Sequence, residues 1–340
     1  MPSTTVRLDA PLDMHLHLRD GEMLENIAKG SAQTFSGAVI MPNLVPPVSS
    51  KEELIAYKNR IAKAIGETPF TPYMTLFFKP DYDQKFLESL REELTAIKLY
   101  PAGITTNSEG GVSGFDIEEL RPALEAMSTL DIPLCIHGET NGFVMDREAE
   151  FVSIYEKLAT AFPDLKIIME HITTKESVDA LEKFDNLYAT ITVHHLLITL
   201  DDVAGGMLQP HLFCKPIAKR PEDRAALQKV ALAAHPKVMF GSDSAPHPKH
   251  AKEACGCAAG VFTAPVALQL LTELFEKNNA LDKLQAFISG NAQRIYGVHP
   301  IAKQVILEKK PFNVPADYHG VVPLYAGETL AYSIREITHG

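Results

Sequence analysis

Two histidines stand one residue apart near the start of the chain, His15 and His17 in the stretch DMHLHLRDG. Alternate residues of an extended strand project from the same face, with Cα atoms about 7 Å apart. Two imidazoles at that spacing can converge on one cation, with metal–nitrogen bonds of about 2.1 Å. The pair taken alone is equally typical of a half-buried strand whose histidines form ordinary hydrogen bonds. Its interpretation therefore depends on which other residues reach the same place.

Several other short apolar runs also end in residues that can bind a metal ion or a substrate. These residues are Asn43, His137, His171, Asp243 and His247. Imidazole and carboxylate groups are common ligands of zinc. If the ends of these runs meet in space, the sequence predicts a metal centre rather than a set of unrelated polar residues.

Lys98 lies inside an apolar run, between Ile97 and Leu99. A lysine in such a strand is costly unless it is paired or modified. One interpretation is a structural ion pair with a carboxylate. The other is an amine that neighbouring cations keep neutral, so that it captures CO2 as a carbamate, an anion with two oxygens that can bridge two metal ions.

The elements that must position these residues are short apolar strands that alternate with longer amphipathic helices. The predicted strands span residues 12–16, 37–41, 73–78, 96–100, 133–137, 166–171, 187–193 and 237–242. Predicted helices include 51–65, 84–96, 116–130, 147–162, 175–184 and 220–234. Ser50 and Asp116 occupy N-cap positions. This alternation indicates parallel β/α units.

Eight such units predict an α/β chain folded as a (β/α)8 TIM barrel, in which the carboxyl ends of the strands form the catalytic face. The alternative is an open doubly wound sheet, but no GxGxxG motif follows the first strand. We expect one domain over residues 1–340. Its last part, from about 301 to 340, would be a short C-terminal appendage packed on the barrel.

Composition limits the partners of the chain. Its 340 residues carry a formal net charge of -11 and no basic block, which argues against nucleic acid and anionic membranes. No apolar run approaches the roughly 20 residues of a membrane span. The first residues lack the pattern of a signal peptide, so we expect a cytoplasmic protein with reduced cysteines. We interpret Cys255-Gly-Cys257 as a tight turn in preference to a zinc site.

The segments that carry these residues resemble the dihydroorotases, a family of the amidohydrolase superfamily of binuclear metal barrels. The matching segments are DMHLHLRDG, MPNLVPP, KLYPAGITTNS, IHGE, EHITTK, HLFCKPIAKR and GSDSAPHPKHAKE. They run in matching order from residue 13 to about residue 260. The HxH motif near the N-terminus resembles the compact bacterial, class II form. Hydantoinases and allantoinases generally carry a β-sandwich before this motif, and remain the alternative within the superfamily. A non-catalytic barrel that acts as a scaffold is the alternative outside it.

The resemblance implies a specific metal centre with two zinc ions per chain. His15 and His17 would bind the more buried ion together with Asp243, and His137 and His171 would bind the second. Lys98, as N6-carboxylysine, would bridge both ions along with a hydroxide. Glu139 and Glu170, which adjoin these histidines in the sequence, could orient the imidazoles or could instead be exposed to solvent. We expect His194 and His195, at the end of the seventh strand, to serve packing.

The resemblance also implies the reaction and the residues that hold its substrate. The activity would be the reversible cyclisation of N-carbamoyl-L-aspartate to L-dihydroorotate and water, the third step of de novo UMP synthesis, with Asp243 as the catalytic proton carrier. The partner would be this small molecule, and the chain could form a homodimer. The expected substrate-binding residues are Arg19, Asn43 and His247 for the carboxylate, the backbone of Lys215 and Ala258 for the ring, and Thr105 and Thr106 on a mobile loop.

Overall fold

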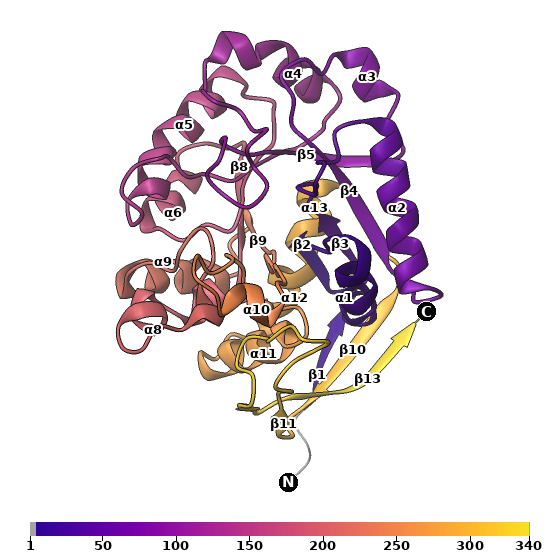
Figure 1. Ribbon diagram of the computed structural model, residues 1–340, viewed down its shortest axis with the longest axis vertical. Helices are drawn as coiled ribbons and strands as arrows, with labels where there is room; N and C mark the ends of the chain where they lie inside the picture. Colours follow the sequence, from indigo (N-terminus) through magenta and orange to yellow (C-terminus); the bar gives the residue numbers. More distant parts are fainter. Residues whose placement is uncertain (1–4, 340) are drawn as a thin grey trace.

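The computed structural model describes residues 5–339, so the two ends of the expected 1–340 domain lie outside the described residues. Eight parallel strands follow one another around a single sheet in chain order, and helices surround it (Figure 1). The strands are β2 (Leu12–Leu16), β3 (Gly37–Ile40), β4 (Thr71–Phe77), β5 (Leu94–Leu99), β6 (Leu134–Ile136), β7 (Ile167–Met169), β8 (Leu187–Ile191) and β9 (Val238–Phe240). The predicted (β/α)8 barrel is confirmed.

The barrel closes where the first of these strands meets the last, just beyond their ends. Leu16 and Ser244 form a parallel bridge. The backbone N–H of Asp243 donates to the carbonyl of His15 at 2.8 Å, and that of His17 donates to the carbonyl of Ser244 at 3.2 Å. The closure therefore fixes the two histidines of the HxH motif beside Asp243.

The helices cover the outside of the barrel and fill its connections. They are α1 (Gly21–Thr34), α2 (Lys51–Ile65), α3 (Gln84–Glu88), α4 (Ile117–Thr129), α5 (Arg147–Ala161), α6 (Lys175–Leu181), α7 (Val193–Leu197), α8 (Leu200–Ala204), η1 (Pro210–Leu212), α9 (Pro221–Leu232), α10 (Lys249–Lys252), α11 (Ala267–Lys277), α12 (Leu281–Gln285), η2 (Ala286–Gly290) and α13 (Asn291–Tyr296). Ser50 caps α2 in a capping box with Glu53, and Asp116 caps α4, as the sequence predicts.

Two predicted elements are wrong in detail. The helix expected over 84–96 ends at Glu88, because Leu94 pairs with Met74 in the β4–β5 ladder and must be extended. The apolar spacing of this segment suited a helix, but the pairing of the sheet overrides it. The strand expected over 187–193 ends at Ile191, where Thr192 caps α7. His194 and His195 therefore lie on a short helix and not at a strand end.

The C-terminal appendage is a small antiparallel sheet that also includes the N-terminal strand. Its order is β1 (Thr5–Asp9), β10 (Lys303–Glu308) and β13 (Ser333–His339), beside the short pair β11 (Phe312–Asn313) and β12 (Thr329–Leu330). The buried amine of Lys303 donates to the carbonyls of Ala32 and Phe35 at the end of α1. This contact ties the appendage to α1. Figure 1 shows β1, β10 and β13 side by side at one edge of the molecule.

The alternation of side chains along β5 shows how the core and the site are separated. Ile97 and Leu99 pack in the large cluster between strands and helices, whereas Ala96 packs in a smaller cluster inside the barrel. Lys98 shares the interior side with Ala96 and lies one step closer to the carboxyl end. The interior is thus apolar at the bottom and polar at the top. Within residues 5–339, no helix has the length and apolar character needed to span a membrane.

Candidate metal centre and active site

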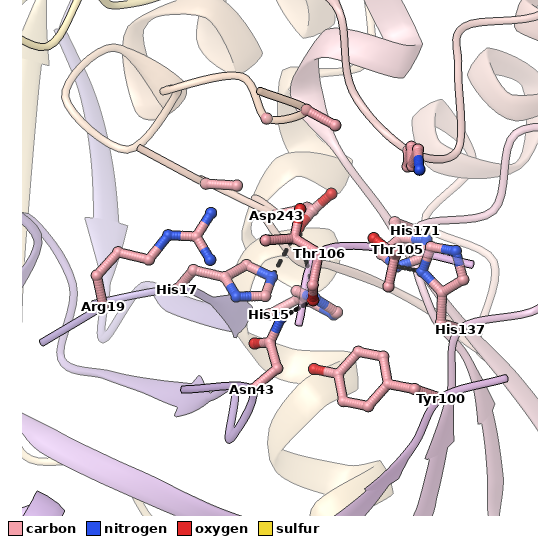
Figure 2. Close-up of a pocket in the computed structure, with 14 residues that line it drawn as sticks. His15, His17, Arg19, Asn43, Tyr100, Thr105, Thr106, His137, His171 and Asp243 are labelled. Carbon is pink, nitrogen blue, oxygen red and sulfur yellow. Dashed lines mark hydrogen bonds and ion pairs between the residues drawn. The ribbon is translucent and has the colours of Figure 1, made fainter. Parts of the chain in front are cut away.

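A pocket opens at the carboxyl ends of the barrel strands, where the sequence analysis placed the polar residues (Figure 2). Side chains from several different strands and their following loops converge on it. The residues that line it are His15, His17, Arg19, Asn43, Tyr100, Thr105, Thr106, His137, His171, Lys215, Asp243, Ala245, Ala259 and Gly260.

The first group of candidate ligands in this pocket comes from the two strands that close the barrel. His15, His17 and Asp243 are buried, and one donor atom from each lies within 4.8 Å of the others. Nε2 of His17 is 3.1 Å from Oδ1 of Asp243, and Nε2 of His15 is 3.5 Å from it. Burial lowers the pKa of His17 to about 3. Burial alone would raise the pKa of Asp243, but His17 and the neighbouring imidazoles hold it well below its usual value. The neutral imidazole of His17 beside an ionised carboxylate suits a cation.

The second group is the pair His137 and His171, from the ends of β6 and β7. Nδ1 of His137 lies 3.1 Å from Nε2 of His171. The ring centroid of His171 is 4.9 Å from that of His15, so the two groups of ligands are neighbours. Burial lowers the pKa of His171 well below its usual value, which leaves this imidazole neutral and able to bind a metal.

Lys98 lies beneath these groups and lacks the partner that a buried amine requires. Its exposed fraction is 0%, and its Nζ has no hydrogen-bond partner among residues 5–339. The structural ion pair considered from the sequence is therefore not formed there. Burial lowers the pKa of the amine. An orphaned amine beneath two groups of ligands fits a metal centre in which this side chain carries a further group.

Two buried glutamates contact candidate ligand histidines, so of the two alternatives the orienting position is the one the structure has and solvent exposure is not. Oε2 of Glu170 lies 2.7 Å from Nδ1 of His15 and accepts a hydrogen bond from Thr190. Oε2 of Glu139 lies 2.8 Å from Nε2 of His137. A carboxylate bound to one ring nitrogen fixes the orientation of the imidazole and makes the other nitrogen a better ligand.

Three residues of the site have left-handed backbone conformations that favour glycine. The φ angles are 58° for Arg19, 40° for His171 and 42° for Asp243. Such angles are uncommon for residues with a Cβ and occur often at functional sites. Here they turn the chain sharply after a strand, so that the side chain enters the pocket while the backbone leaves it.

Beside the ligands lies a cationic and polar group that can hold an anion. Nε of Arg19 donates to the carbonyl of Pro246 at 3.2 Å, and Nε2 of His247 lies 3.1 Å from the Arg19 guanidinium and 3.0 Å from the carbonyl of Ala259. Burial lowers the pKa of His247 to about 3, which leaves its imidazole neutral beside Arg19. Asn43 lines the pocket next to them. Figure 2 shows Arg19, His17 and Asn43 on the side of the pocket opposite His137 and His171.

The loop that carries Thr105 and Thr106 lies over the pocket. Nδ2 of Asn43 donates to the carbonyl of Thr106 at 2.9 Å, and Nζ of Lys215 donates to the carbonyl of Ile104 at 3.1 Å. Both threonines line the pocket. These contacts tie the loop to residues on two other segments of the barrel face.

One expected substrate contact occupies a different position. Ala258 does not line the pocket, and its N–H donates to the carbonyl of Ala251. The next two residues, Ala259 and Gly260, line it instead. Their segment is held by the buried amine of Lys252, which donates to the carbonyls of Phe213, Ala258 and Gly260 at 2.8, 2.8 and 2.7 Å. Lys252 thereby joins the 258–260 segment to the segment that carries Lys215.

The profile of the Amidohydrolase family matches residues 12–301.

The chain belongs to the amidohydrolase family.

Full-length relatives of this amidohydrolase include several dihydroorotases. A dihydroorotase of Helicobacter pylori (strain HPAG1) is 44% identical over 338 residues, which cover 98% of this chain and 99% of the relative. The crystal structure of a dihydroorotase from Campylobacter jejuni has a TM-score of 0.95 and 58% identity, and covers 99% of both chains. That of a dihydroorotase from Saccharomyces cerevisiae in complex with 5-fluoroorotic acid has a TM-score of 0.91 and 34% identity, covering 97% of this chain and 98% of the other.

Sequence reasoning did not single out several residues that line the pocket of this amidohydrolase. Tyr100 could have been found, because it lies two residues after Lys98 on the same side of the strand. Three further lining residues shape the pocket wall with their backbone and small side chains, and their residue types gave no signal of this: Ala245, Ala259 and Gly260.

A second set of ligand-type atoms lies outside the residues that line the pocket, in His194, His195 and Cys214. Nε2 of His195 and Sγ of Cys214 both lie within hydrogen-bonding distance of the carbonyl of Pro216, at 3.0 and 3.2 Å. Two of the three groups thus have a structural partner. This agrees with the packing role expected for His195.

Proposed function

We propose that this amidohydrolase is a dihydroorotase, which interconverts N-carbamoyl-L-aspartate and L-dihydroorotate. One observation carries the proposal: two groups of ligands and an orphaned lysine meet at the barrel mouth beside an arginine–asparagine–histidine group that suits a carboxylate. The same arrangement fits a substrate with a carboxylate near a cyclic amide. The names of the full-length relatives support the same reaction.

We further propose that the centre takes two zinc ions. His15, His17 and Asp243 would hold one, and His137 and His171 the other. Lys98, carboxylated by CO2, would bridge them together with a hydroxide. Two such ions would polarise the amide carbonyl and lower the pKa of a shared water.

The side chains of the protein would perform the proton transfer. In the hydrolytic direction water adds to the ring carbonyl and the C–N bond breaks. Asp243, which is ionised and faces the ligands, would accept the proton of the attacking water and deliver it to the departing nitrogen. Cyclisation would follow the same steps in reverse and release water.

The residues beside the centre would orient the substrate. Arg19 offers a planar pair of donors that matches a carboxylate, and Asn43 and His247 would complete the binding. This local positive charge is important, because the chain as a whole carries a net charge of -11 and repels anions at long range. The backbone of Lys215 and the 258–260 segment would contact the ring.

The decisive experiment is an assay of the metal-loaded protein with L-dihydroorotate, hydantoin and allantoin, together with metal analysis. We expect turnover of dihydroorotate and about two zinc ions per chain. Turnover of hydantoin or allantoin with none of dihydroorotate would show that the substrate of this protein is another cyclic amide. A protein without bound metal and without turnover would support a scaffold.

The loop contacts lead to a prediction about Thr105 and Thr106. Either threonine changed to alanine should lower kcat about tenfold or more, because the loop excludes water and its hydroxyls can donate to the substrate. Steady-state kinetics and metal analysis would check this, and metal content should stay unchanged. Ser113→Ala, an exposed change in the same loop, is the control. Near-normal turnover in both threonine variants would contradict the prediction.

Lys252 provides a second prediction, since it holds two backbone segments that line the pocket. Lys252→Met should raise KM for dihydroorotate about tenfold, because the two backbone segments would shift and weaken their contacts with the substrate. A tenfold change corresponds to about 1.4 kcal/mol, roughly one charge-assisted hydrogen bond. Lys303→Met is a matched control, because Lys303 is also buried and donates to backbone carbonyls, but far from the pocket. Both variants should have a lower Tm. An unchanged KM in Lys252→Met alone would show that the lysine serves stability only.

A further inference from the structure

Tyr100 lies in the wall of the pocket, directly after β5. It shares the interior side of this strand with Lys98, whose Nζ is 5.1 Å from the centroid of its ring. Its ring stacks on that of Phe77, with centroids 5.1 Å apart and an angle of 26° between the planes. The side chain is therefore held in one place, with an exposed fraction of 2%.

The hydroxyl of Tyr100 has no hydrogen-bond partner within residues 5–339. A buried polar group without a partner costs roughly 1–3 kcal/mol, so such groups need an explanation. Two other buried tyrosines have partners: the hydroxyl of Tyr57 donates to the carbonyl of Arg19 at 2.8 Å, and that of Tyr82 donates to the carbonyl of Ser49 at 2.6 Å. The hydroxyls of Tyr73 and Tyr332 also lack a partner within residues 5–339, but neither residue lines the pocket, so it is the place of Tyr100 in the pocket wall that distinguishes it.

The direction of this hydroxyl indicates what its partner is. Tyr100 lines the pocket, and Figure 2 shows its hydroxyl directed into the space beside Asn43 and His15. The hydroxyl therefore lies near Asn43, which is proposed to hold the substrate carboxylate, and near His15, which is proposed to hold a metal ion.

We infer that the Tyr100 hydroxyl donates a hydrogen bond to an oxygen of the bound substrate, and that Tyr100 is a further substrate-binding residue of this site. The inference rests on the proposed function, which supplies a substrate with carboxylate and carbonyl oxygens. The hydroxyl would gain in the complex the partner that it lacks in the free protein. Phe77 behind the ring fixes its position, so little entropy is lost on binding.

The test is the variant Tyr100→Phe, prepared with its metals and compared with wild type. We expect kcat/KM for L-dihydroorotate and for N-carbamoyl-L-aspartate to fall about 10- to 100-fold, the loss of one hydrogen bond to a charged or polarised oxygen. Metal content should stay at the wild-type value. The Tm of the substrate-free variant should not fall, because the hydroxyl that is removed has no partner there.

Tyr73→Phe is the matched control. Tyr73 also has a buried hydroxyl without a partner in the part of the chain described, but it packs in the apolar cluster inside the barrel and does not line the pocket. Its kcat/KM should stay within about twofold of wild type.

Three results would overturn the assignment, and they are distinguishable. An unaffected kcat/KM in Tyr100→Phe, with wild type active, would remove the tyrosine from the substrate site and leave the proposed function intact. A loss of bound metal would show that the hydroxyl supports Lys98 and the metal centre instead. Absence of dihydroorotate turnover by the wild type would overturn the proposed function and this inference together.

Discussion

Replacing Asp243 by asparagine should lower kcat for dihydroorotate by a factor of about 10^3 or more, within the range that a positioned acid–base group contributes. The substitution keeps the shape of the side chain but removes both the negative charge beside His17 and the ability to carry a proton. Steady-state kinetics in both reaction directions, with metal content measured on the same samples, would check this result. Both directions should be affected alike, because the same carboxylate serves each.

A suitable control is Asp223→Asn. Asp223 is also buried, and its carboxylate accepts hydrogen bonds from the backbone N–H groups of Lys175 and Arg220, away from the pocket. This variant should lose stability but retain activity. If Asp243→Asn keeps kcat within tenfold of wild type, Asp243 is not the proton carrier.

Replacing Lys98 by methionine should abolish measurable turnover and reduce bound metal below two ions per chain. Methionine has a similar length and no charge, so it suits the apolar surroundings of a side chain that is 0% exposed. The metal-free variant should be at least as stable as the metal-free wild type, because the amine that is removed has no partner there. Metal analysis, thermal unfolding and kinetics together would establish this pattern.

The mass of the intact protein offers an independent measurement. Wild type analysed under non-denaturing conditions should carry the mass of one added CO2, and Lys98→Met should not. Lys303→Met, at another buried lysine, should keep both the added mass and the metal. A Lys98→Met protein that binds two ions and turns over substrate would contradict the role of a carboxylated lysine.

Local sequence signals were sufficient to predict the barrel and to single out many residues of the candidate site, while their individual roles came from the family resemblance. The strand 12–16 was predicted with the bounds that the structure gives, since its apolar run is short and ends in the HxH motif. Lys98 drew attention because a charge inside an apolar strand conflicts with burial. His137, His171 and Asp243 followed from their positions at strand ends, because a parallel barrel brings those ends together.

Features that depend on distant parts of the chain could not be predicted in the same way. The extension of β5 back to Leu94 depends on its pairing with Met74, and the entry of β1 into the appendage depends on pairing with β10. The left-handed conformation of Asp243 is imposed by the closure of the barrel and has no signal in the residue type. The anchoring of two segments by Lys252 likewise needs three carbonyls that only the folded chain assembles.

The closure of the barrel also imposes an order on the maturation of the protein. Ser242 donates its N–H to Asp13, a residue 229 positions earlier, and Asp243 bonds to His15 across the same seam. At the ribosome, about 5–20 residues are added each second, so Asp243 is synthesised roughly ten to fifty seconds after the HxH motif. Metal captured by the nascent chain would lack its third ligand throughout this interval. In the proposed centre, stable loading of the first ion would therefore follow completion of the last barrel strand, and bound metal would then indicate that translation and folding have both reached the seam.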